Sequence, residues 1–157
     1  MTQPSSVITD EMRAYIGKES GPVVVEVDKS ACRMFARAVG YTDPVFYDEE
    51  FAKSKGYRSI LAPPGFLGHT IYNPARPQRL DYLPPFEIPY KRLLNGGNDL
   101  QYFDDICAGD VLTATSKLVD LQEREGRLGP MLITVTEITY RRGDKVVAVM
   151  RGTLISY

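Results

Sequence analysis

Three residues of this chain could supply the proton transfers of general acid–base chemistry, namely Tyr41, Asp43 and His69. His69 is the single histidine, and imidazole is the side chain whose ordinary pKa falls between about pH 5 and 8. Tyr41 and Asp43 stand two positions apart, so one turn could present a phenol and a carboxyl group together. Each residue also has a structural interpretation: an Asp-Pro turn beside a packed tyrosine, and a structural histidine near a loop.

The stretch at residues 40–48 resembles the hydratase motif of the MaoC-like (R)-specific enoyl-CoA hydratases and dehydratases, G-D-x-N-P-x-H-x-D. Pro44 and Asp48 match it, whereas Tyr41 stands at the aspartate, Asp43 at the asparagine and Phe46 at the histidine. Hydration of a conjugated thioester needs a base that activates water and an acid that protonates the α-carbon. A phenylalanine has no proton to give, and a tyrosine titrates near about pH 10. This chain alone is therefore not expected to run the reaction, and Phe46 is expected to fill the histidine's space.

The resemblance covers most of residues 20–157 and implies the N-terminal type of MaoC dehydratase domain, which has a hot-dog fold. It rests on an ordered set of segments at residues 61–66, 95–99, 109–112, 127–131 and 151–155. Some members of this family lack the catalytic pair and assemble with a second hot-dog chain or domain that carries it. By this resemblance, the empty half widens the channel for a bulky or long acyl chain, while its partner performs the chemistry.

The resemblance also implies a substrate-binding set, which comprises Pro64, Gly65, Phe66, Gly96, Gly97 and Asn98. Because glycine permits close approach of the backbone, N–H groups of residues 95–99 could contact a thioester carbonyl. The same glycines suit a β-bulge that enters a long strand, and both possibilities stay open. The expected ligand is an acyl-CoA or acyl-carrier thioester, with no cofactor. No metal is expected either, since one histidine and two distant cysteines cannot form an ordinary zinc site.

The composition is that of an ordinary globular protein, with 157 residues, 43% hydrophobic and 25% charged residues, and a net charge of −1. This length suits one domain with a real core. Lys and Arg are scattered, which argues against nucleic-acid binding, and no stretch approaches the length of a membrane span. The N-terminus has no readable secretory signal, and Cys32 and Cys107 are isolated. The expectation is a cytoplasmic protein with reduced, buried thiols.

The first half of the chain is predicted to be mainly helical. A short helical extension within residues 1–20 precedes a strand at residues 23–27, where valines alternate with other residues. Asp28 or Ser30 is expected to cap a helix that ends at Gly40. Asp48 is expected to cap a second short helix, which ends at Gly56.

The second half is predicted to be strand-rich. Five prolines predict a long irregular loop across residues 74–90. Four β-rich runs follow at residues 93–106, 111–121, 131–141 and 146–157, separated by turn sequences. The predicted fold is α+β, a single hot-dog domain over residues 1–157, with a curved antiparallel sheet wrapped on a central helix.

These observations predict a substrate-accommodating, non-catalytic subunit of a heteromeric (R)-specific enoyl-CoA hydratase or 3-hydroxyacyl-thioester dehydratase. The hydro-lyase would then be the complex, a dimer of this chain with a catalytic MaoC-like partner. One alternative is a self-sufficient hot-dog enzyme, a hydratase or a thioesterase, that uses Asp43, Tyr41 or His69. Another is an acyl-CoA binding module without turnover.

Overall fold

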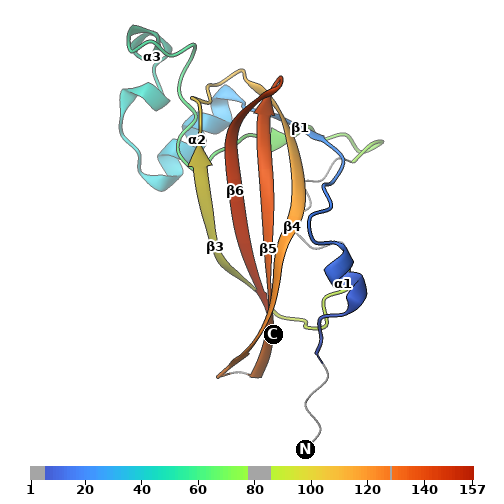
Figure 1. Cartoon of the computed structure of the whole chain (residues 1–157). Coiled ribbons are helices and arrows are strands. Elements are labelled where there is room, and N and C mark those ends of the chain that lie inside the picture. Colours follow the sequence, from blue (N-terminus) through green and yellow to red (C-terminus); the bar gives the residue numbers. More distant parts are fainter. Residues whose placement is uncertain (1–5, 78–85, 128) are drawn as a thin grey trace, which may run out of the picture.

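The computed structural model describes residues 6–77, 86–127 and 129–157 of the chain. Its elements, in chain order, are α1 (Asp10–Ala14), β1 (Val23–Glu26), α2 (Lys29–Val39), the 3-10 turn η1 (Pro44–Phe46), α3 (Glu49–Ser54), β2 (His69–Thr70), β3 (Leu93–Tyr102), β4 (Val111–Gly126), β5 (Gly129–Arg142) and β6 (Lys145–Ser156). Figure 1 shows the long strands side by side in a curled sheet, with α2 across one end of it and α3 beyond that end.

The sheet is antiparallel throughout, in the order β2-β1-β4-β5-β6-β3. β4, β5 and β6 form the meander that the sequence predicts, because the turns between them carry glycines at positive φ, Gly129 and Gly143. β3 returns antiparallel to β6 and forms one edge of the sheet. That edge is exposed along most of its length.

The two faces of the sheet differ because successive residues of a strand point to opposite sides. On β5, Leu132 and Tyr140 point to what we call the inner face and join the buried core. Glu137 points to the outer face. There it forms ion pairs with Lys117 at 2.9 Å and Arg151 at 2.8 Å. The curl of the sheet thus separates an apolar concave side from a charged convex one.

Side-chain caps set the ends of the helices, as the sequence predicts. The Asp28 carboxylate accepts the backbone N–H of Ala31 at 2.8 Å at the start of α2. Asp48 does the same for Phe51 at 3.0 Å at the start of α3. α2 ends at Gly40, whose φ of +82° is left-handed and therefore favours glycine.

Different helices cover the two ends of the inner face. At one end, Cys32 of α2 joins a core cluster that includes Ile138 and Tyr140 of β5. At the other end, Met12 of α1 packs with Leu118 and neighbouring residues of the sheet. The middle of the inner face, around β3, β5 and β6, holds a groove instead.

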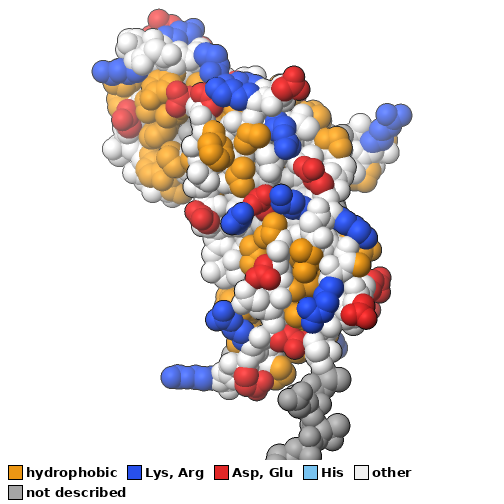
Figure 2. Space-filling model, viewed as in Figure 1, with side chains coloured by type: hydrophobic (Ala, Val, Ile, Leu, Met, Phe, Trp, Pro, Cys, Tyr) orange, Lys and Arg blue, Asp and Glu red, His pale blue; other side chains and the backbone are white. Residues whose placement is uncertain are grey.

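α2, η1 and α3 form a helical lobe at one end of the sheet (Figure 1). Figure 2 shows hydrophobic side chains gathered on the surface of this lobe. Large exposed hydrophobic residues on α2 and just after it are Met34, Val39 and Tyr41. This surface is more apolar than the outer face of the sheet, where charged side chains of both signs are interspersed.

Element lengths differ from the sequence prediction in places. β3 ends at Tyr102 rather than near residue 106, and β4 continues to Gly126, past its predicted end at residue 121. Part of the predicted irregular loop, residues 78–85, lies outside the described residues, and residues 71–77 and 86–90 contain neither helix nor strand. Phe86 and Tyr90 pack beside α1. Within the described part of the chain, no helix is both long and apolar enough to cross a membrane.

Candidate functional site

The three altered motif positions lie together in the segment between α2 and α3. The rings of Tyr41 and Phe46 pack against each other, with centroids 5.5 Å apart and planes inclined by 30°. Between them, the Asp43 carboxylate accepts the backbone N–H of Val45 at 2.9 Å and caps η1. The hydroxyl of Tyr47 donates to the Tyr41 carbonyl. Asp43 therefore holds the turn in shape, and the two aromatic rings fill the space beside it.

Gly65 lies in the turn after two prolines and has two physical reasons to be glycine. Its φ is +97°, a conformation that residues with a side chain rarely adopt. A Cβ atom at this position would lie 3.2 Å from the ring of Phe35. The Gly65 N–H donates to the phenol oxygen of Tyr102 at 2.9 Å. Of the predicted binding segment, Pro64 and Gly65 are exposed, while Phe66 is half-buried.

Tyr102, at the end of β3, is a site residue that the sequence reasoning missed. Burial raises the pKa of its phenol, the hydrogen bond from Gly65 opposes that shift, and neighbouring Tyr41 adds to it. The phenol is therefore neutral at ordinary pH, and its O–H remains available to donate to a ligand. No local signal marks this residue, because Gly65, which donates to it, and Tyr41, which affects its pKa, lie far away in the sequence.

Two further aromatic contacts extend from the Gly65 turn. Phe35 of α2 and Phe66 have ring centroids 5.7 Å apart, and Phe66 meets His69 edge-to-face at 5.5 Å. His69 is exposed, and its backbone pairs with Glu26 of β1. We call this whole group the aromatic site, and its members are Phe35, Tyr41, Phe46, Phe66, His69 and Tyr102. It is a hydrophobic surface that carries two phenols, of Tyr41 and Tyr102, and one imidazole, of His69.

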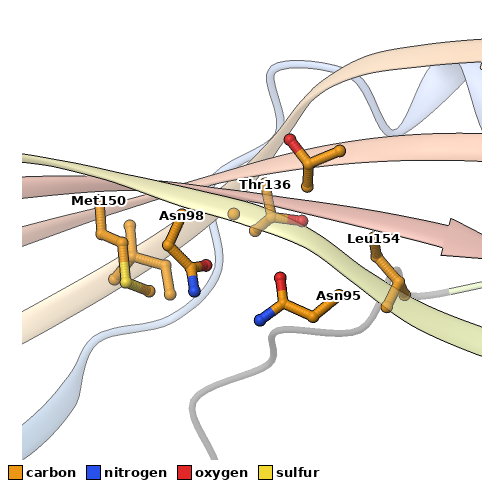
Figure 3. A pocket seen from close by; sticks show the side chains of 8 residues that line it. Asn95, Asn98, Thr136, Met150 and Leu154 are labelled. Atoms are coloured by element: carbon orange, nitrogen blue, oxygen red, sulfur yellow. The ribbon is translucent and has the colours of Figure 1, made fainter.

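The predicted glycine segment forms a β-bulge in β3, where the pairing with β6 shifts between Asn95 and Gly97. The Gly97 N–H donates to the Asn95 side-chain oxygen at 2.9 Å, so it is not available to a thioester carbonyl. A Cβ atom on Gly96 would lie 2.9 Å from Thr153, against the neighbouring strand. Asn98, by contrast, lines the groove on the inner face, and Figure 3 shows its side chain there together with that of Asn95.

The groove and the aromatic site lie along the same strand. Tyr102 is opposite Ala148 of β6, whereas Asn98 is opposite Gly152, four residues further along each strand. The groove has a volume of about 410 Å³, a size typical of small-molecule sites. The two predicted binding segments are thus arranged in line rather than around one point.

An ion network holds the chain just beyond Tyr102. Arg142 forms ion pairs with Asp104 at 2.5 Å and with Asp110 at 3.0 Å. Arg58 also pairs with Asp110 at 2.8 Å, and the Asp110 carboxylate accepts the Cys107 N–H at 3.0 Å. Hydrogen bonds to charged groups are the stronger ones in proteins. The network therefore fixes the end of β3 against the turn between β5 and β6.

Metal and thiol chemistry find no support in the described residues. These residues contain no group of three or more His, Cys, Asp or Glu side chains arranged to hold a metal ion. Cys32 and Cys107 are buried free thiols, and burial raises the pKa of Cys32 to about 12. A thiol with such a pKa stays protonated and is a poor nucleophile.

The family is identified by comparison with known proteins. The model of the FAS1-like dehydratase domain region matches residues 14–150, so this chain belongs to the FAS1-like dehydratase family. A UPF0336 protein of Streptomyces avermitilis is 32% identical over 115 residues, which cover 73% of this chain and 75% of that protein. A UPF0336 protein of Thermobifida fusca is 29% identical over 136 residues, which cover 86% of this chain and 87% of that protein.

Solved structures confirm the hot-dog fold. The C-terminally truncated HadBC complex of Mycobacterium tuberculosis, a 3R-hydroxyacyl-ACP dehydratase, contains a chain with a TM-score of 0.72 and 25% identity, covering 90% of this chain and 97% of that one. A chain of the ChsH1-ChsH2 complex of the same organism has a TM-score of 0.68 and 16% identity, and the match covers 94% of this chain and 87% of that one. A MaoC-like dehydratase has a TM-score of 0.69 and 16% identity, and the match covers 92% of this chain and 43% of that one. The MaoC-like relationship inferred from the sequence is therefore confirmed.

Proposed function

We propose that this chain is the substrate-accommodating, non-catalytic subunit of a heteromeric (R)-specific enoyl-CoA hydratase or 3-hydroxyacyl-thioester dehydratase. The observation that carries the proposal is the packed ring pair of Tyr41 and Phe46, at the motif positions where the reaction needs a carboxylate and an imidazole. Asp43 does not replace them, because its carboxylate caps η1. The packed ring pair offers neither a carboxylate nor an imidazole at the place where a catalytic half would activate water.

The chain retains groups that suit a thioester without acting on it. The neutral phenol of Tyr102 receives the Gly65 N–H and keeps its own O–H for a carbonyl oxygen. One such hydrogen bond orients a ligand, but it supplies neither the base nor the acid of hydration. The groove on the inner face lies further along the same strand, β3, and an acyl chain that reaches it can lie against apolar side chains.

The exposed edge of the sheet is a second observation in favour of a partner chain. An unpaired edge strand presents a row of backbone donors and acceptors that favours pairing with another strand. β3 is ten residues long and exposed, and Tyr102 and Asn98 both lie on it. The HadBC and ChsH1-ChsH2 structures are complexes of two different chains. A catalytic MaoC-like subunit with the intact motif, paired at β3, is the partner that fits this arrangement.

The test compares three preparations: this chain alone, a MaoC-like chain with the intact motif alone, and the two co-expressed. We expect no hydration of trans-2-enoyl-CoA by this chain and clear turnover of long-chain substrates by the pair. The pair should exceed the catalytic partner alone, which is the control. Robust turnover by the isolated chain that is lost in His69→Ala or Asp43→Asn would overturn the proposal and support a self-sufficient enzyme. Acyl-CoA binding without any gain from a partner would support a binding module.

A further inference from the structure

The groove on the inner face is lined by both apolar and polar side chains. Ile138, Met150 and Leu154 supply hydrophobic contacts, whereas Asn95, Asn98 and Thr136 supply polar groups. Figure 3 shows both asparagine side chains directed toward a common space, with Thr136 behind them on the sheet. In small-molecule sites, a few polar groups in an otherwise apolar cleft fix the orientation of the ligand.

The polar groups that line the groove can form further hydrogen bonds. The Asn95 side-chain oxygen accepts the Gly97 N–H at 2.9 Å, which leaves the amide nitrogen of Asn95 free to donate. Within the described residues, neither the Asn98 amide nor the Thr136 hydroxyl has an intramolecular hydrogen bond. Three groups that can donate hydrogen bonds therefore face one apolar groove.

The inner face of β5 also carries polar residues among apolar ones. Its residues run Leu132, Thr134, Thr136, Ile138 and Tyr140, so two threonines interrupt an apolar row at its middle. Thr134 is 2% exposed, and its hydroxyl is the buried side-chain polar atom that lacks a hydrogen-bond partner among the described residues. Burying a hydroxyl without a partner costs free energy, and valine would fill the same volume without that cost. Thr136, the neighbour of Thr134 on the same face, does line the groove, so this polar interruption of the row borders the place that a ligand would occupy.

The positions of Tyr102 and Asn98 along β3 indicate how far the ligand's polar group lies from its thioester. The four residues from Tyr102 to Asn98 span about 13 Å of extended strand, a length that roughly ten carbon–carbon bonds of an extended chain cover. We infer that the groove recognises an acyl chain that carries a hydroxyl or carbonyl oxygen about ten to twelve carbons from its thioester. This inference rests on the proposed function, which places the thioester at Tyr102 and Gly65.

The test measures binding of three probes to the full chain by isothermal titration calorimetry. The probes are octadecanoyl-CoA, 12-hydroxyoctadecanoyl-CoA and 2-hydroxyoctadecanoyl-CoA, so the two hydroxylated chains differ only in the position of the oxygen. We expect the 12-hydroxy chain to bind about tenfold more tightly than octadecanoyl-CoA, the effect of roughly one net hydrogen bond. The 2-hydroxy chain should show no such gain.

Variants locate the effect in the groove. Asn98→Ala and Thr136→Val should each reduce the preference for the 12-hydroxy chain, while Thr139→Val, on the outer face of the same strand, should keep it. Thermal unfolding of each variant checks that it is folded, and the wild-type comparison of the two positional isomers stands without any variant. Equal affinity for all three probes overturns this inference and leaves the proposed function intact. Binding of none of them contradicts the proposed function as well.

Discussion

The backbone N–H of Gly65 donates to the phenol oxygen of Tyr102 at 2.9 Å, although the two residues are 37 positions apart in the chain. This bond joins the turn that follows α3 to the exposed edge strand β3. It therefore ties the segment between α3 and β2 to the edge of the sheet at the point where the aromatic site lies.

Removing the phenol oxygen tests this connection. Tyr102→Phe keeps the ring but leaves the Gly65 N–H without its partner, so we expect a loss of about 0.5–1.5 kcal/mol in the free energy of unfolding. Urea denaturation measures the difference. Tyr72→Phe is the matched control, because Tyr72 is 89% exposed and should tolerate the same change. Equal stability of both variants would mean that the bond contributes nothing in solution.

Gly65→Ala should be clearly destabilising, by about 1–3 kcal/mol, because it combines an unfavourable φ with a close contact to Phe35. Gly17→Ala separates the two causes. Gly17 has a φ of +83° but open space where a Cβ would lie. Thermal or urea unfolding should show the larger loss for Gly65→Ala, and an additional Phe35→Leu substitution should recover part of it. A larger loss for Gly17→Ala would contradict this account.

Rebuilding the motif tests the assignment of its positions. The triple variant Tyr41→Asp, Asp43→Asn and Phe46→His restores the three altered motif residues, and asparagine can still cap η1. Positioned acid–base groups contribute on the order of 10²–10⁴-fold. We expect weak hydration of crotonyl-CoA, well below that of an intact family enzyme, because the surrounding residues do not orient the new groups. Asp43→Asn alone is the control and should stay inactive. Should a folded triple variant show no turnover, the motif assignment would lose its main support.

Glu137 makes stability depend on pH in the acid range. Hydrogen bonds from Lys117 lower its pKa from 4.5, burial opposes this, and Arg151 adds to the lowering. A carboxyl with a depressed folded-state pKa contributes stability above its unfolded pKa and loses it as the pH falls through the folded value. We expect Glu137→Gln to be less stable than the wild type at neutral pH, with the gap closing below about pH 4.5. Urea midpoints across the pH range measure this, and a constant gap would contradict it.

Local chemistry explains which parts of the fold could be predicted from the sequence. Caps such as Asp28 and Asp48, and the helix end at Gly40, act on neighbouring residues, and the structure places them as predicted. The end of β4 was predicted too early, because residues 122–125 are polar and lack the alternation of a half-buried strand. Pairing with β5 continues there without burial of that segment.

The candidate site was less accessible to prediction for a physical reason. Tyr41, Asp43 and Phe46 are close in sequence, so their grouping followed from the motif, and their rings do meet. Tyr102 joins them only through tertiary folding, and nothing in its neighbourhood marks it. The groove depends on which residues of β3, β5 and β6 point to the same face of the sheet. The bulge at Asn95 and Gly97 shifts the alternation of side chains along β3, so the sequence pattern alone does not predict that face.

The edge strand β3 contributes to both the aromatic site and the groove, and it is also the exposed border of the sheet. A partner that pairs along this border would therefore stand beside any bound acyl chain. By thermodynamic reciprocity, whatever factor the partner adds to ligand affinity, the ligand adds to subunit affinity. Substrate binding and subunit association would then be thermodynamically coupled, and the subunits would dissociate and exchange most readily when no substrate is bound.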